Sequence, residues 1–196
     1  MSIDFRPAEP EESAELSTII QQTSGGLVDY ILTGVVPFTK PHQILNSQVV
    51  IRNSLYSYRN IIVCEEDGDI IGLILAYPWN EQVASDMTRR YLSKTKYTAV
   101  EELLNSAEEN SLFINTFWVA EQCRGEGLAD VLMDVAVDWA VREGLSRLSL
   151  HVWKGNERAV KFYTRHGFVQ TRTFDFPDHK LLPYKTGKLQ LCKELA

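Results

Sequence analysis

The sequence predicts a mixed α/β (α+β) protein built around one sheet, with helices on its faces. Apolar strand-like segments alternate with amphipathic helix-like segments in the second half of the chain, and a tight hairpin signal joins two apolar strands near its middle. The chain has 196 residues, 44% hydrophobic and 23% charged, which is enough for one domain with a buried core. We therefore expect a single domain over residues 1–196, with a mixed, mostly antiparallel, twisted sheet of about six to seven strands.

The first half of the chain mixes short helices with strands. A strand is predicted at residues 3–6, and helices at 10–22, 27–32 and 41–53. Strands at 61–65 and 70–77 flank Glu66-Asp67-Gly68-Asp69, a sequence typical of a two-residue hairpin turn. Residues 80–110 are polar, with weak helical patterns at 84–92 and 98–107. They predict a helical insertion rather than a separate domain, because the segment is too short to bury a core of its own.

The second half has stronger periodicity. A strand at 112–119 precedes a helix at 128–141, whose apolar stripe is Leu128, Val131, Leu132, Val135, Ala136 and Trp139. Asp130, Asp134 and Asp138 fall on its opposite, solvated side. The pattern then predicts a strand at 147–153, a short helix capped by Asn156 and ended by Gly167, and strands at 168–174 and 188–193.

Composition excludes several classes of protein. The net charge is −6, which argues against nucleic-acid binding and mildly favours cationic or neutral substrates. No apolar run reaches the ~20 residues of a membrane span, and no signal peptide is evident. Three widely spaced cysteines fit reduced thiols in a cytoplasm better than disulfides or a zinc site. We expect a cytoplasmic protein without a metal, either monomer or homodimer.

The segment from Gln122 to Ala129 joins the strand at 112–119 to the helix at 128–141. A strand, a glycine turn and a helix N-terminus together favour an anion site, usually for phosphate. The turn reads Gly-Leu-Ala where a Walker loop needs Gly-Lys-Ser or Gly-Lys-Thr, and a dinucleotide fingerprint needs a third glycine where Asp130 stands. Both of those nucleotide sites are therefore disfavoured.

Two motifs together resemble the GNAT superfamily of N-acetyltransferases. Gln122, Gly125 and Gly127 match its pyrophosphate signature. A second match follows, about 30 residues downstream, and consists of Leu150-His151-Val152, Asn156, Ala159, Phe162-Tyr163 and Gly167-Phe168. The resemblance covers residues 111–169 sharply. It implies the acyl-CoA N-acyltransferase fold and direct transfer of an acetyl group from acetyl-CoA to an amine in a ternary complex.

The resemblance also implies the residues that hold acetyl-CoA. Backbone amides from Arg124 to Ala129 would bind the pyrophosphate, and the backbone of Phe117 and Val119 would pair with the pantetheine arm. The full expected set is Phe117, Trp118, Val119, Arg124, Gly125, Glu126, Gly127, Leu128, Ala129, Asn156, Ala159 and Phe162.

Catalysis would need a donor for the leaving thiolate and a base for the amine. The family places a tyrosine at the position of Tyr163, which is the expected general acid. The strand at 112–119 has no carboxylate where many family members carry a glutamate base. His151 is a candidate base, although a purely structural role for this histidine is an equally open alternative. Asn115 could orient the amine or a water.

The acceptor is left open between small amines, amino acids and peptide or protein amines. In this fold it would be bordered by residues 23–30, 79–110 and 175–184. The missing carboxylate keeps a second hypothesis open: a CoA-binding sensor or interaction module with weak or no turnover.

Overall fold

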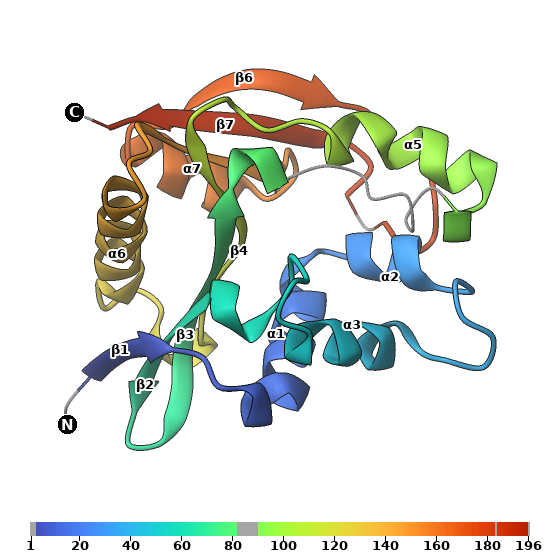
Figure 1. The fold of residues 1–196 in the computed structure, drawn as a ribbon. Coiled ribbons are helices and arrows are strands. Elements are labelled where there is room, and N and C mark those ends of the chain that lie inside the picture. The colour runs from blue at the N-terminus through green and yellow to red at the C-terminus, as the bar shows by residue number, and fades with distance from the viewer. Residues whose placement is uncertain (1–2, 82–89, 183, 196) are drawn as a thin grey trace.

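The computed structural model describes residues 3–81, 90–182 and 184–195 and contains a seven-stranded sheet flanked by helices (Figure 1). The strands are β1 (Ile3–Pro7), β2 (Ile61–Glu66), β3 (Asp69–Pro78), β4 (Ser111–Val119), β5 (Arg147–Trp153), β6 (Val169–Phe174) and β7 (Lys188–Glu194). They lie in the order β1-β2-β3-β4-β5-β7-β6, and every neighbouring pair is antiparallel except β4 and β5. The predicted mixed, mostly antiparallel sheet is confirmed.

The helices follow the predicted periodicity, with differences at their ends. They are α1 (Ser13–Thr23), α2 (Leu27–Leu32), α3 (Pro41–Val50), α5 (Lys94–Leu104), α6 (Leu128–Arg142) and α7 (Glu157–Arg165). The predicted helix at 10–22 begins as the 3-10 helix η1 (Pro10–Glu12), and α3 ends three residues earlier than predicted. The pattern at 98–107 forms α5, which begins earlier because the Ser93 side chain caps it at the Lys96 amide. The pattern at 84–92 falls mostly on residues 82–89, outside the described residues.

The turn between β2 and β3 has the backbone that its sequence predicts. Asp67 and Gly68 both have positive φ, at 52° and 92°. Two successive positive φ values characterise the hairpin turn that matches the twist of the flanking strands. The turn therefore sets the register of β2 against β3.

Each face of the sheet carries its own hydrophobic cluster. On one face α6 packs Leu132, Met133 and Ala136 against β3, β4 and β5, with Tyr163 of α7 in the same cluster. On the other face α1 and α3 cover β2 and β3. Figure 1 shows α6 on one side of the sheet and α1, α2 and α3 on the opposite side. The strong apolar stripe predicted for α6 is thus the stripe that meets the sheet.

The sheet opens in its middle. β4 and β5 pair only from Ser111 with Arg147 to Ile114 with Leu150, although both strands continue beyond this point. Just after the last pair, Asn115 is an extra residue in β4, since Leu75 faces Thr116 and Ala76 faces Ile114. A bulge of this kind bends a strand and increases its twist. The second half of β4 therefore has a backbone edge that β5 does not cover.

A third hydrophobic cluster closes one end of this opening. It contains Tyr30 of α2, Tyr97 and Val100 of α5, Trp153 of β5 and Leu182 of the β6–β7 connection. Lys96 of α5 donates a hydrogen bond to the Thr33 carbonyl oxygen, 2.7 Å away, and so joins α5 to the end of α2. The three segments expected to border the acceptor are brought together by this cluster.

Candidate functional site

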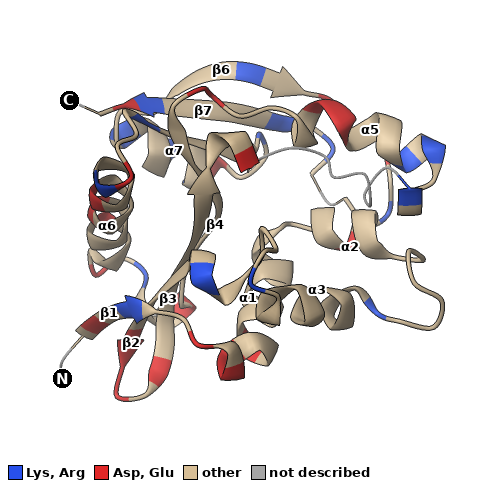
Figure 2. Ribbon diagram, viewed as in Figure 1, with Lys and Arg blue, Asp and Glu red and all other residues tan. Residues whose placement is uncertain are grey.

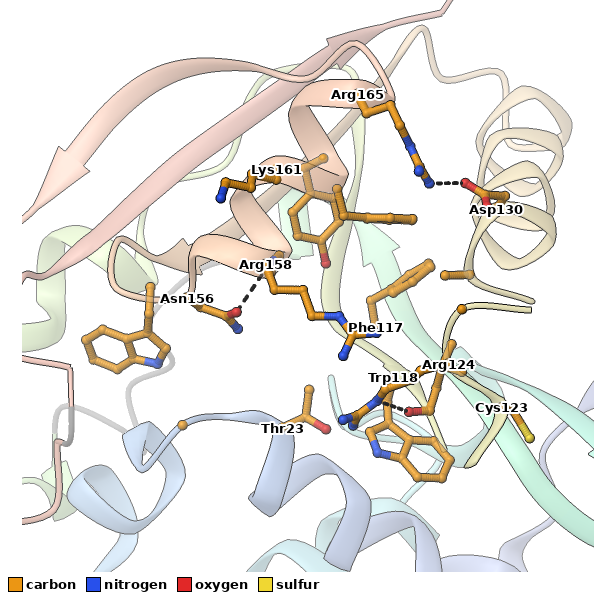
Figure 3. A pocket seen from close by; sticks show the side chains of 18 of the residues that line it. Thr23, Phe117, Trp118, Cys123, Arg124, Asp130, Asn156, Arg158, Lys161 and Arg165 are labelled. Atoms are coloured by element: carbon orange, nitrogen blue, oxygen red, sulfur yellow. Dashed lines mark hydrogen bonds and ion pairs between the residues drawn. The ribbon is translucent and has the colours of Figure 1, made fainter. Parts of the chain in front are cut away.

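A groove of about 740 Å³ lies between the end of β4, the glycine turn and α7 (Figure 3). Its lining residues are Gln22, Thr23, Gly25, Phe117, Trp118, Val119, Cys123, Arg124, Gly125, Gly127, Ala129, Asp130, Trp153, Asn156, Arg158, Ala159, Lys161, Phe162, Tyr163, Arg165 and Tyr184.

The glycine turn presents a row of backbone amides that the protein itself does not use. The amides of residues 125–127 have no hydrogen-bond acceptor among the described residues, and Leu128 and Ala129 open α6, where amides lack intrahelical partners. The first α6 amides bonded to the turn are those of Asp130 and Val131, both to the Gly127 carbonyl oxygen. Five consecutive N–H groups at a positive helix end form a site for an anion.

Gly125 and Gly127 are required by the shape of this turn. Their φ angles are 91° and 89°, in the left-handed region that favours glycine. A Cβ atom at either position would meet no protein atom within 4 Å. The glycines therefore set the backbone conformation, and they leave the space in front of the amides open.

The groove is basic although the protein is acidic. Arg124, Arg158, Lys161 and Arg165 line it, against the single acid Asp130. Acidic residues gather instead around β1, η1 and the β2–β3 turn (Figure 2), where Arg6 bridges Glu12 and Glu65. An anion entering this groove would meet positive charge that the overall net charge of −6 conceals.

These cations differ in how far they are neutralised. Arg165 pairs with Asp130 at 2.5 Å, and Lys161 lies 3.8 Å from Glu157. Arg124 donates from Nε to the Val119 carbonyl oxygen at 3.1 Å, which orients its guanidinium at the groove wall. Arg158 has no ion pair or hydrogen bond among the described residues and extends across the groove toward Arg124 (Figure 3). Arg158 is therefore the groove cation best placed to bind an anionic ligand.

Tyr163 lies at the inner wall of the groove. It is 8% exposed, and its ring packs against Phe117, Phe162 and Phe168. Its hydroxyl has no hydrogen-bond partner among the described residues, and burial alone raises the pKa of this phenol above its ordinary value. The hydroxyl is therefore protonated at neutral pH and available as a donor to a group in the groove.

The second motif forms the opposite wall. The Asn156 side-chain oxygen accepts a hydrogen bond from the Ala159 amide at 3.2 Å and so caps α7 as predicted. Ala159 and Phe162 follow on the helix face that lines the groove, and Phe162 stacks near Phe117 with ring centroids 5.6 Å apart. The structure thus brings both motifs, β4 and the α7 face, to one groove.

Two of the expected ligand-binding residues lie outside the groove lining. Glu126 is exposed at the turn, and Leu128 is 7% exposed because it packs into the cluster under α6. Both still belong to the amide row, so their backbone N–H groups stay candidates while their side chains do not. Val119 and Trp118 were also expected, and both line the groove near the end of β4. Figure 3 shows the Trp118 side chain there.

Asn115 occupies the β4 bulge rather than the groove lining. Its Nδ2 donates to the Tyr77 hydroxyl at 3.0 Å, and its Oδ1 accepts from Thr116 at 3.1 Å. The same amide lies close enough to the Tyr56 hydroxyl to counter part of the rise in the Tyr56 pKa that burial causes. The amide is thus fixed at the point where β4 and β5 separate.

His151 points to the sheet face beneath the α5–β4 connection. Its Nε2 lies 3.1 Å from the Ser106 Oγ, and its ring makes edge contacts with Phe113 and Phe174. Burial, together with the charge of Lys188, holds the pKa of His151 well below its ordinary value. The imidazole is neutral at pH 7, and it does not line the groove, so its role as a base stays a prediction.

Sequence reasoning did not identify the basic residues of α7 as a group. Arg158, Lys161 and Arg165 recur at spacings of three and four, which places them on one helix face. This signal was present in the sequence after the Asn156 cap. Asp130 was expected in a solvated face, but it binds Arg165 and His166, at 2.5 and 2.8 Å, and so ties α6 to α7.

Comparisons with known proteins agree with this geometry. The model of the Acetyltransferase (GNAT) family matches residues 34–168, which is more than half of the chain. The chain belongs to the GNAT family of acetyltransferases. The solved structure of an N-acetyltransferase from Staphylococcus aureus Mu50 has a TM-score of 0.72 at 18% identity, covering 96% of this chain and 99% of that one. The two proteins therefore share one fold over nearly the whole length of both chains.

Curated relatives of this GNAT protein match over shorter stretches. An uncharacterized N-acetyltransferase, YdgE, of Bacillus subtilis (strain 168) is 36% identical over 63 residues, which are 32% of this chain and 40% of the relative. A mycothiol acetyltransferase of Jonesia denitrificans is 36% identical over 59 residues, or 30% of this chain and 19% of the relative. The match therefore spans less than half of either relative.

The described part of this GNAT protein offers neither a membrane-spanning helix nor a cluster of metal-ligating side chains. No helix there is both long and apolar enough to cross a membrane. No group of three His, Cys, Asp or Glu residues there is arranged to hold a metal ion.

Proposed function

We propose that this protein transfers the acetyl group of acetyl-CoA directly to an amine in a ternary complex. The observation that supports this best is the continuity of the groove. It runs from the free amides at the glycine turn, along the uncovered edge of β4, to the hydroxyl of Tyr163. A diphosphate, an amide-bearing arm and a reacting thioester would follow one another in that order.

The residues present fit the CoA part of this substrate. The amide row and Arg124 suit a diphosphate, and Arg158 faces it from the other wall. The half of β4 beyond Ile114 offers backbone groups to the two amides of pantetheine, as an added strand would use them. Phe117, Phe162 and Ala159 supply apolar contacts for the arm between its amides.

The chemical step needs two proton transfers. The amine lone pair forms the new C–N bond at the thioester carbonyl, and the C–S bond breaks with its electron pair on sulfur. The thiolate takes a proton from the Tyr163 hydroxyl, and the nitrogen of the new amide loses its proton to water, from which the Tyr163 oxygen is then reprotonated. The neutral amine must exist first, and for a lysine-like pKa of about 10.4 this costs roughly 4.6 kcal/mol at pH 7.

β4 offers no carboxylate for that deprotonation. Asn115 holds the Tyr77 hydroxyl beside the opening of the sheet, so polar groups there are arranged to orient an amine or a water without acting as a base. We expect the enzyme to use the fraction of acceptor that is already neutral. The rate should then rise with pH until the acceptor itself is titrated.

Thiol release from acetyl-CoA with a panel of amines tests this function, together with thermal shift by CoA alone. An acetyltransferase is stabilised by CoA and releases thiol only when an amine is added. Stabilisation by CoA without thiol release across the panel would favour a CoA-binding module that lacks turnover. If no CoA form stabilises the protein, the proposed function is wrong.

A further inference from the structure

A second set of polar side chains lies on the sheet face opposite α6. His151 and Trp153 of β5 stand opposite Gln190 and Lys188 of β7, respectively. Residues two apart on a strand share a face, so all four side chains lie on one face of the sheet. The groove machinery described above accounts for Trp153 alone among them.

Two of these side chains are buried without full hydrogen bonding. Gln190 is fully buried; its Nε2 donates to Glu108 at 3.0 Å, while its Oε1 has no partner. Lys188 is 8% exposed and has no ion pair or hydrogen bond to any of the described residues. Native proteins seldom leave such groups unsatisfied, so each one calls for an explanation.

Lys188 carries its positive charge in a buried position beside the ring of Trp153. Its Nζ lies 5.0 Å from the centroid of the Trp153 ring, and burial lowers the pKa of Lys188 to about 8. The amine is then still about nine-tenths protonated at pH 7. His151, whose pKa the charge of Lys188 helps to lower, is neutral at this pH, and the nearby carboxylate of Glu108 accepts a hydrogen bond from Gln190. No carboxylate of the described residues forms an ion pair with the Lys188 ammonium.

The position of Lys188 relates it to the proposed reaction. Trp153 borders the groove and contacts Lys188 with the same ring, and its Nε1 donates to the Ser24 carbonyl oxygen at 2.9 Å. Trp153 is also the last residue of β5, on the part of the strand that has separated from β4. Trp153 is therefore the residue that lies between the groove and Lys188.

We propose that Lys188 binds a carboxylate of the acetyl acceptor, so that the acceptor is a small amine that also carries a carboxylate group. The unpaired Oε1 of Gln190 offers an acceptor for a donor group of the same molecule. The cluster of Tyr30, Tyr97 and Leu182 covers this end of the sheet, which favours a small molecule over a protein surface. This proposal rests on the acetyltransferase function.

Matched acceptor pairs test it. The twenty amino acids and their carboxamides are compared in thiol release from acetyl-CoA, for the wild type, Lys188→Met and Lys185→Met. Lys185 is an exposed lysine nearby that pairs with Asp178 and serves as the matched control. CoA binding is measured for each protein by calorimetry.

The wild type and Lys185→Met should prefer the carboxylate member of a pair by about tenfold in kcat/KM, which corresponds to one charge-assisted hydrogen bond. Lys188→Met should lose this preference through KM while binding CoA normally. Equal use of both members by the wild type, or a preference that survives Lys188→Met, overturns the proposal while leaving the acetyltransferase function intact. Absence of CoA binding by the wild type overturns both.

A second measurement does not depend on turnover. The pKa of Lys188 is followed by NMR of selectively labelled lysine in CoA-saturated protein, with each amino acid and each carboxamide as probe. A bound carboxylate raises this pKa because it stabilises the ammonium. A pKa that no amino acid raises contradicts the proposal.

Discussion

Tyr163→Phe is the most informative single substitution, because the structure separates its effect on catalysis from its effect on folding. The ring is held by Phe117, Phe162 and Phe168, with centroid distances of 6.2, 5.4 and 5.4 Å, and phenylalanine keeps these contacts. The hydroxyl has no partner among the described residues, so its removal leaves no buried group unsatisfied. The free energy of unfolding should therefore change by less than about 0.5 kcal/mol.

The catalytic effect should be large. If the hydroxyl donates to the leaving thiolate, losing it removes one preorganised donor, which costs about 10²–10³ in kcat, or about 2.7–4 kcal/mol. The affinity for CoA should stay unchanged, because the hydroxyl matters only as charge develops on sulfur. The assay is steady-state thiol release, with urea unfolding and CoA titration on the same preparations.

Tyr184→Phe is the matched control, since Tyr184 also lines the groove but its ring stacks on Trp153 rather than on the aromatic rings around Tyr163. It should keep kcat. A Tyr163→Phe enzyme with kcat within about threefold of the wild type would refute the role of Tyr163 as general acid.

Three further predictions concern other parts of the molecule. Arg158→Gln should weaken CoA binding about tenfold in calorimetry, because Arg158 has no internal counter-ion, whereas Lys161→Gln should do less. Gly25→Ala should lower the free energy of unfolding in urea by about 1–3 kcal/mol, because φ is +58° and the new Cβ would lie 2.6 Å from the Trp153 Nε1; Gly68→Ala, with no atom within 4 Å of the new Cβ, should cost less. Lys188→Met should be more stable than the wild type by about 3 kcal/mol at pH 7, because burial lowers the Lys188 pKa from 10.5 to about 8. Between pH 8 and pH 10.5 the unfolded wild-type chain binds a proton at Lys188 that the native protein does not, so the stability of the wild type rises with pH. The difference in stability between the wild type and Lys188→Met should therefore vanish near pH 10.5. A difference in stability that does not depend on pH would contradict this prediction.

Local patterns predicted the fold well where one face of an element is buried. The apolar stripe of α6 and the Asp67-Gly68 turn are short-range signals, and both elements form as predicted. Helix ends were less certain, as at α3, where Ile51 is already extended. The cap at Ser93 fixed the start of α5 more strongly than its weak apolar periodicity did.

The two motifs that line the groove could also be predicted, because each is a short-range signal in the sequence. The glycine turn and the Asn156 cap are local motifs, and the structure brings them together at opposite walls of one groove. The positions of His151 and Lys188 depend on the pairing of β5 with β7. These strands are neighbours in the sheet, although residues 154–187 separate them in the sequence. No local pattern reports which side chains such a pairing places together.

The central claim is that the amides of residues 125–129 hold the diphosphate of CoA. Titration of ¹⁵N-labelled protein with CoA, followed by NMR, tests it most directly. The account predicts saturable shifts of these five amide resonances, with smaller shifts in β4 and α7. Saturable binding that leaves these amides unchanged, or no binding at all, would contradict it.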